Sequence, residues 1–371
     1  MQFIDLKKQY SLIDKAVLTS IENVLQHGQY IMGPEITELE KQLADFVGVR
    51  HAIACASGTD ALLMALLALD IEPGDEIITT PFSFFATAEV IALCQAKPVF
   101  VDIQPETYNL DPSQLVSAIT DRTKAIMPVS LYGQCADITA INHIANRFDI
   151  PVIEDAAQSF GATHFGHRSC GLSTLACTSF FPSKPLGGYG DSGACFTDDD
   201  TLAQKLSHIR IHGQNQRYCH QRIGINGRMD TIQAAILLQK LALFPAEIKL
   251  RHEIGERYYH ALKDVVKLPL IKPENTSVFA QFTIEVKQRD LLAQALHDLG
   301  IPTAIHYPTP LHLQEALSYL GYQRGSFPCA ELASAQVISL PMSPYLTPDD
   351  QDKVIQAVKH NLARLKLTDY V

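Results

Sequence analysis

The feature that most constrains the fold of this chain is a regular alternation of short apolar runs and amphipathic stretches between residues 51 and 156. The apolar runs are nearly uninterrupted, which predicts strands buried on both faces. The stretches between them carry apolar residues at helical spacing. Strands are predicted at 51–57, 75–80, 98–103, 124–130 and 151–156, with helices at 59–69, 86–96, 112–119 and 138–148. The alternation therefore predicts a mainly parallel sheet with helices on both faces.

The rest of the chain extends this sheet and adds a smaller region. Further strands are expected at 176–181 and 193–197, with helices at 34–47, 199–211 and 229–265. After residue 270 the order changes to a strand at 278–286 and helices at 291–299 and 349–365. We therefore expect an α/β fold with a large three-layer α/β/α domain over residues 1–245. A smaller α+β domain is expected over residues 246–371.

Composition and charge narrow the class of protein. Of the 371 residues, 47% are hydrophobic and 19% are charged, which is typical of a soluble globular protein. The net charge of −10 argues against a general nucleic-acid binder, which would carry a basic face. The N-terminus lacks the pattern of a signal peptide, and we find no apolar run of about 18 residues. We therefore expect a cytoplasmic protein with no membrane partner.

The eight cysteines give no sign of a metal or redox site. None of them forms a C-x-x-C pair, so the sequence favours neither a zinc ribbon nor a thioredoxin-like motif. Most lie in apolar or small-residue segments, where reduced cysteines act as small hydrophobic side chains. We expect no bound metal and no disulfide framework.

One glycine-rich stretch, SFFPSKPLGGYGDSGA at 179–194, matches a dinucleotide-binding fingerprint through Gly188, Gly190 and Gly193. That fingerprint requires a helix to open at its last glycine. Here Gly193 leads into ACFT, which has the pattern of a strand, so the match has the wrong context. We expect these glycines instead to allow tight turns and positive φ around Lys184.

Three separate stretches together suggest a cofactor site. Asp155 ends a predicted central strand, at the edge of a parallel sheet where ligands bind. ASGTDA at 56–61 opens a helix, whose free N–H groups suit a phosphate. Alone, the aspartate could be a helix cap or an ion-pair partner, and the turn could be explained by capping. With Lys184 added, the three stretches supply what pyridoxal 5′-phosphate requires: a phosphate site, an acid for the ring nitrogen and a lysine for the aldehyde.

The whole chain resembles the DegT-type nucleotide-sugar aminotransferases, which are fold-type I pyridoxal-phosphate enzymes of the aspartate aminotransferase superfamily. The resemblance rests on many motifs in order, including FIDLKKQY, HGQYIMGPEITELE, ASGTDAL, VIEDAAQSFGA, SFFPSKPLGGYGDSGA, GINGRMDTIQAAIL and AIHYPTPLH. It implies the fold-type I architecture for the large domain.

The resemblance also implies roles for individual residues. Lys184 would be the catalytic lysine that bonds to the cofactor aldehyde, and Asp155 would pair with the ring nitrogen. The other implied cofactor contacts are Gly58, Thr59, Phe84, Gln158, Ser179 and Asn226. Asn226 would reach the phosphate of a neighbouring subunit, which implies a homodimer with shared active sites. Arg228, His306 and Tyr307 are the implied substrate contacts.

The family transfers an amino group, usually from L-glutamate, to a keto group of a nucleotide-linked hexose. Within it, PVSLYGQCAD, EDAAQSFGA and HYPTPL are most similar to the enzymes that act on UDP-2-acetamido-2-deoxy-3-oxo-D-glucuronate. Their product is a 3-amino sugar for bacterial surface polysaccharide. The residues alone leave open another 3-keto or 4-keto hexose linked to dTDP, UDP or GDP. A non-catalytic regulatory relative is the alternative of another class, but it would have little reason to keep Lys184, Asp155 and Gln158 together.

Overall fold

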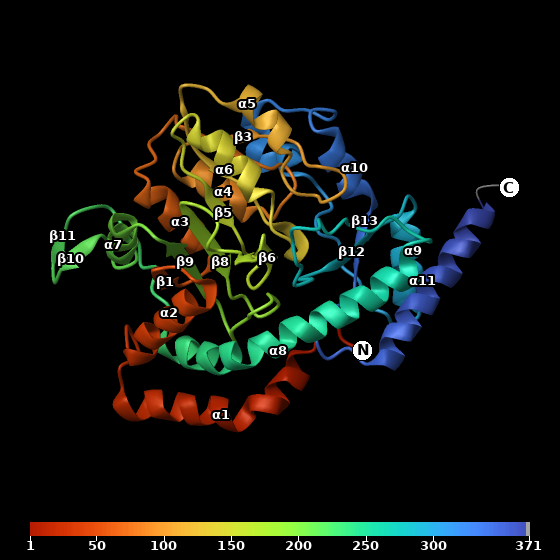
Figure 1. The fold of residues 1–371 in the computed structure, drawn as a ribbon, viewed down its shortest axis with the longest axis horizontal. Coiled ribbons are helices and arrows are strands. Elements are labelled where there is room, and N and C mark those ends of the chain that lie inside the picture. The colour runs from red at the N-terminus through yellow and green to blue at the C-terminus, as the bar shows by residue number, and fades with distance from the viewer. Residues whose placement is uncertain (369–371) are drawn as a thin grey trace.

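The computed structural model describes residues 1–368 and is built around a mostly parallel sheet (Figure 1). Its strands are β1 (His51–Cys55), β2 (Glu76–Thr79), β3 (Lys97–Phe100), β4 (Thr123–Met127), β5 (Ile153–Asp155), β8 (Leu175–Ser179) and β9 (Gly193–Thr197). Four strands run in the order β1-β9-β8-β5, and three in the order β3-β2-β4. Parallel bridges from Ile126 to Val152 and from Val129 to Asp155 connect β4 to β5 and join the two sets. β9 is antiparallel to both of its neighbours.

Helices cover both faces of the sheet, because alternate residues of each strand point to opposite sides. One face packs against α3 (Gly58–Ala68), α4 (Ala86–Leu93) and α7 (Asp200–Ile209), and its core includes Ile53 and Ile77. The other face packs against α2 (Pro34–Val47), α8 (Thr231–Leu262), α5 (Leu115–Ala118) and α6 (Ile138–Asn146), and its core includes Ala54 and Ile78. The predicted three-layer α/β/α arrangement is confirmed.

The long helix α8 connects the two ends of the molecule. It packs along α1 (Leu6–His27) and α2 at one end and reaches the C-terminal elements at the other (Figure 1). Among residues 1–368, α8 is the one helix long and apolar enough to cross a membrane by length and composition. However, 50% of its most apolar stretch is buried inside the protein, as expected of a core helix.

The C-terminal third forms a second core. Strand β12 (Phe282–Glu285) pairs antiparallel with β13 (Val337–Leu340). Helices α9 (Arg289–Asp298) and α11 (Pro348–Thr368) contribute side chains to the core beside these strands, and α10 (Pro328–Gln336) leads directly into β13. Tyr258 and Leu262 from the second half of α8 pack into this core, whereas Leu237 and Phe244 from its first half pack under the large sheet. The division after residue 245 therefore falls within one continuous helix, and it stays a prediction.

Two short hairpins have no counterpart in the sequence prediction. They are β6 (Thr163–His164) with β7 (His167–Arg168), and β10 (Gln214–Gln216) with β11 (Cys219–His220). Their residues are mostly polar, so they lack the alternation that marks a half-buried strand. The β10–β11 hairpin projects from the body of the protein beside α7 (Figure 1).

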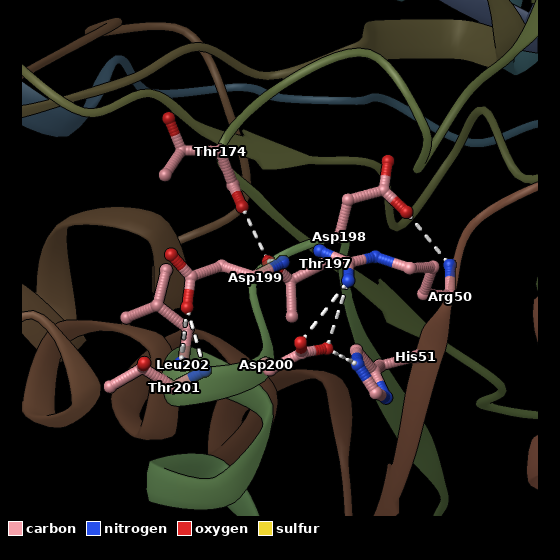
Figure 2. Close-up of polar contacts among 9 residues, drawn as sticks. All are labelled: Arg50, His51, Thr174, Thr197, Asp198, Asp199, Asp200, Thr201 and Leu202. Atoms are coloured by element: carbon pink, nitrogen blue, oxygen red, sulfur yellow. Dashed lines mark hydrogen bonds and ion pairs between the residues drawn. The ribbon is translucent and has the colours of Figure 1, made fainter.

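The acidic run at residues 198–200 caps the start of α7 and connects it to residues 50–51. Asp199 caps the helix by accepting hydrogen bonds from the backbone N–H groups of Thr201 and Leu202. Figure 2 shows Asp200 facing the guanidinium of Arg50 and the ring of His51, at the start of β1. These partners fasten α7 to the neighbouring edge strand, and they are exposed, so each contributes little stability.

Candidate active site

The sequence-predicted residues converge at the carboxyl edge of the sheet, around a cavity of about 490 Å³. The parallel strands end there and the antiparallel strand β9 begins there, so segments distant in the chain meet. Nine of the predicted site residues line the cavity: Gly58, Thr59, Phe84, Asp155, Gln158, Ser179, Lys184, His306 and Tyr307. A second cavity, of about 520 Å³, opens near residues 263–267 and 285–288 and holds none of them.

The loop that carries Lys184 is a compact turn after β8. The N–H of Lys184 donates to the carbonyl of Phe181 at 2.8 Å, and the N–H of Gly188 donates to the carbonyl of Phe180 at 2.7 Å. Gly193 does begin a strand, so the rejection of the dinucleotide fingerprint is confirmed. The backbone bonds hold the lysine at a defined place on the cavity wall.

The prediction of positive φ for the glycines around Lys184 is wrong. Neither Gly187, Gly188, Gly190 nor Gly193 has a positive φ. Close backbone approach is the reason for glycine instead, because a Cβ on Gly187 would lie 2.4 Å from the carbonyl oxygen of Pro182. A Cβ on Gly193 would similarly lie 2.5 Å from the carbonyl oxygen of Ser57.

Lys184 and Asp155 share the cavity, and burial shifts both of them toward their neutral forms. Burial lowers the pKa of the Lys184 amine below its usual range, and the charge of Asp155 partly opposes this. Burial likewise raises the pKa of Asp155. The hydrogen bonds from Thr87 and Ala157 and the charge of Lys184 lower this pKa, but by less than burial raises it. The site therefore offers an amine that deprotonates more readily than an ordinary lysine.

Asp155 is oriented by a short chain of two hydroxyl groups, from Thr87 on α4 and from Ser83 in the segment before it. The Thr87 hydroxyl donates to Asp155 Oδ2 at 2.9 Å, and the Ser83 hydroxyl lies 3.0 Å from that of Thr87. The backbone N–H of Ala157 donates to Asp155 Oδ1 at 3.2 Å. Sequence reasoning missed Thr87 and Ser83. The available signal was their position after β2, whose carboxyl end lies at the same sheet edge as Asp155.

The turn at 57–59 forms a small cradle at the N-terminus of α3. The Ser57 hydroxyl caps this helix by accepting from the N–H of Asp60 at 3.0 Å. Gly58 lies so close to the end of β8 that a Cβ there would be 2.5 Å from the Cβ of Ser179. Gly58, Thr59 and Ser179 therefore form one surface, with unpaired helix N–H groups and a hydroxyl suited to an anion.

Gln158 connects the sheet edge to the C-terminal wall of the cavity. Its side-chain oxygen accepts from the N–H of Tyr132 at 2.8 Å, and its amide donates to the Tyr307 hydroxyl at 2.9 Å. The Tyr132 hydroxyl in turn donates to the carbonyl of His306. This network, with a ring contact between Phe84 and Tyr307 at 6.2 Å, holds residues 306–307 against the large domain.

His306 is held as a neutral ring. Its Nδ1 lies 2.9 Å from the Ser339 hydroxyl, which is itself 2.9 Å from the hydroxyl of Thr283. Burial, together with the nearby charge of Lys184, lowers the pKa of His306 to about 4. The ring can therefore exchange hydrogen bonds at neutral pH without adding positive charge to the cavity.

Asn226 and Arg228 do not line the cavity of their own chain. Their loop nevertheless lies beside the 57–59 turn, because the carbonyl of Gly227 accepts from the N–H of Ala56 at 2.9 Å. Asn226 is exposed, and Nε of Arg228 is buried without a hydrogen-bond partner among the described residues. The structure therefore brings together every predicted site residue except these two.

The residues present fit pyridoxal 5′-phosphate, judged on their own chemistry. Asp155 is a buried acid whose pKa is raised mainly by burial, which the nearby charge of Lys184 only partly offsets. Lys184 is a buried amine on the same cavity, and the glycine-lined cradle at Gly58 suits a phosphate. No group of three or more His, Cys, Asp or Glu that could hold a metal ion occurs among residues 1–368.

Comparisons with known proteins agree with this chemistry. Residues 11–359 match the model of the DegT/DnrJ/EryC1/StrS aminotransferase family. The chain is 56% identical to UDP-2-acetamido-2-deoxy-3-oxo-D-glucuronate aminotransferase of Pseudomonas aeruginosa over 93% of this chain and 96% of the relative. A DegT DnrJ EryC1 StrS aminotransferase from Brucella abortus has a TM-score of 0.95 and 45% identity, covering 97% and 99% of the two chains. NtdA from Bacillus subtilis with bound cofactor PMP has a TM-score of 0.88 and 33% identity, covering 97% and 83%.

The neutral state of His306 can be measured directly. With a pKa near 4, the folded protein keeps this ring unprotonated while an unfolded chain takes up the proton near pH 6.5. His306 therefore makes folding less favourable as the pH falls through this window. We expect NMR of ¹⁵N-histidine-labelled protein to show the His306 ring still neutral at pH 5. The variant His306→Gln should lack this signal. A midpoint for His306 near pH 6.5 would contradict the prediction.

Proposed function

The chain belongs to the DegT/DnrJ/EryC1/StrS aminotransferase family and is a pyridoxal-phosphate-dependent aminotransferase, and we propose that it acts on UDP-2-acetamido-2-deoxy-3-oxo-D-glucuronate. The amino donor would be L-glutamate, and the product a 3-amino sugar for bacterial surface polysaccharide made in the cytoplasm. The observation that carries this acceptor is the likeness to the Pseudomonas aeruginosa enzyme over nearly the full length of both chains.

Lys184 is proposed as the catalytic base. When bound, pyridoxal phosphate supplies a ring that takes up the electron pair left when the carbon bearing the amino group loses a proton. Burial lowers the pKa of Lys184, so part of its amine is neutral and able to accept and return that proton. Asp155, oriented by Thr87, would hold the proton on the ring nitrogen.

The cradle formed by Gly58, Thr59 and Ser179 is proposed to bind the cofactor phosphate. The N-terminus of α3 supplies backbone N–H groups and the positive end of the helix dipole. Gln158 would lie beside the phenolic oxygen of the ring, and Phe84, which is 56% exposed at the cavity wall, would stack on it.

The charge of the cavity supports an active site shared between two subunits. Within the described part of the chain, Lys184 is the one lysine or arginine among the lining residues, while Asp155 and Asp191 are both acidic. A cofactor phosphate and a sugar nucleotide would add several negative charges. We therefore propose that a second copy of the chain supplies Asn226 to the phosphate and Arg228 to the substrate. Arginine binds such anions in a fork geometry.

The surface around these two residues has the character of a subunit interface. The apolar side chains of Tyr30, Ile31 and Met32 are 40–50% exposed, and Ile31 bridges to Asp230 beside the Arg228 loop. Tyr218, in the turn of the projecting β10–β11 hairpin, is 80% exposed, and Ile223, just after the hairpin, is 85% exposed. Exposed apolar side chains of this extent favour burial against a partner.

Replacing the lysine tests the catalytic assignment. Borohydride treatment of wild-type protein should fix the cofactor covalently on the peptide that contains Lys184, as read by mass spectrometry. Lys184→Ala should show no such adduct and should lose about 100- to 10,000-fold in turnover, because the positioned base is gone. Lys41→Ala, which removes an exposed lysine on α2, should behave as wild type. An adduct on a different lysine would exclude the assignment.

Mixing two inactive variants tests the shared site. Lys184→Ala and Arg228→Ala should each be nearly inactive alone. In hybrid dimers, one site combines the intact lysine of one chain with the intact arginine of the other. Co-expression should therefore recover about a quarter of wild-type activity, since half of the dimers are hybrids with one complete site. If Arg228 acts within its own chain, or if the protein is a monomer by sedimentation, no recovery will occur.

The acceptor is tested with a panel of keto nucleotide sugars and L-glutamate. We expect UDP-2-acetamido-2-deoxy-3-oxo-D-glucuronate to give the aminated product, identified by mass, with kcat/KM about tenfold or more above other 3-keto and 4-keto hexoses. Reactions without glutamate or without acceptor serve as controls. A preference for a 4-keto sugar would replace the proposed acceptor, and absence of product with every sugar would contradict the proposed function.

A further inference from the structure

The C-terminal wall of the cavity carries a row of polar side chains at the start of β12. Gln281 immediately precedes the strand, and Thr283 and Glu285 follow at alternate positions, so the three share one face. Thr283 bonds to Ser339 at 2.9 Å, and Glu285 accepts from the Tyr108 hydroxyl at 2.9 Å. This face of β12 therefore points toward the large domain, and Gln281 lies at the end of the row that borders the cavity.

Gln281 differs from the other two members of this row. Thr283 and Glu285 both have protein partners, whereas the side-chain oxygen of Gln281 is buried with no hydrogen-bond partner among residues 1–368. Exchanging the oxygen and nitrogen of the amide would place another unpaired polar atom at the same position. Leaving such a group buried and unpaired costs free energy, so a partner is expected when the site is in use.

The surroundings of Gln281 restrict what that partner can be. The charged lining groups, Lys184, Asp155 and Asp191, come from the sheet edge and its loops. The lining groups of the C-terminal wall are Gln281, His306 and Tyr307, and His306 is neutral at physiological pH. A carboxamide offers both donors and an acceptor. This wall therefore suits a neutral group that also donates and accepts, rather than a phosphate or a carboxylate.

We propose that Gln281 is a specificity-determining residue that hydrogen-bonds a neutral polar substituent, a hydroxyl or an acylamino group, on the hexose of the acceptor. The inference rests on the proposed function, since it takes the acceptor to be a nucleotide-linked sugar. It extends that function by separating two recognition tasks. Cationic groups hold the nucleotide diphosphate, and the neutral wall reads the sugar ring.

The test is equilibrium binding to the holoenzyme by titration calorimetry, with UDP, UDP-glucose and UDP-N-acetylglucosamine as probes. The variants are Gln281→Leu and Gln281→Ala, which remove the amide with and without apolar bulk. Gln294→Leu, on the exposed face of α9, is the matched control. Wild-type protein should bind the sugar-bearing probes more tightly than UDP.

Both Gln281 variants should lose about tenfold in affinity for a sugar-bearing probe, as for one lost hydrogen bond that leaves its partner unpaired, with UDP affinity unchanged. A loss confined to UDP-N-acetylglucosamine identifies the acylamino group, and an equal loss with UDP-glucose identifies a shared hydroxyl.

Wild-type affinity for the sugar-bearing probes in both Gln281 variants would overturn the inference, as would an equal loss for UDP. A loss in Gln281→Leu alone would also overturn it, because the bulk of leucine would then be the cause. If wild-type protein binds none of the probes, the proposed function itself fails, and the inference fails with it. Gln294→Leu should match wild type throughout.

Discussion

The candidate active site depends on the burial of one amine and one carboxylate in the same cavity. Burial pushes Lys184 and Asp155 toward their neutral forms, and neither charge is fully compensated within the chain. Such an arrangement makes folding less favourable, and it is a common property of sites that must transfer protons. The hydroxyl of Thr87 and the network around Gln158 keep these groups in place until a ligand supplies the missing interactions.

Close packing of the backbone explains how three loops can meet around this pair. Gly58 approaches Ser179, and Gly193 approaches the carbonyl of Ser57, at distances that leave no room for a side chain. Glycine is therefore required by neighbouring segments rather than by an unusual backbone conformation. One consequence is that the proposed phosphate cradle and the lysine loop pack directly against each other at the carboxyl edge of the sheet, an arrangement that favours accurate positioning of reacting groups.

The two sides of the cavity differ in charge. The sheet edge supplies the acid and the amine, while the C-terminal wall supplies neutral groups such as Gln281 and His306. Among the described residues that line the cavity there is no arginine. The loop with Asn226 and Arg228 lies next to the cavity without lining it. A second subunit, as proposed above, would therefore add positive charge to the cavity. It would also cover the exposed apolar side chains beside the Arg228 loop.

The sequence was sufficient for the layers of the fold, because strand and helix periodicity are local properties of the chain. It also led to the expectation that Lys184 and Asp155 share one site, and the structure brings both to one cavity, while their roles stay proposals. It was insufficient for Thr87 and Gln281, which act through partners or a cavity formed by distant segments. It also assigned the glycines near Lys184 to the wrong cause. Positive φ belongs to one residue, but close approach depends on a second segment that packing brings near. Packing of distant segments sets which side chains share the cavity, and no local pattern reports that.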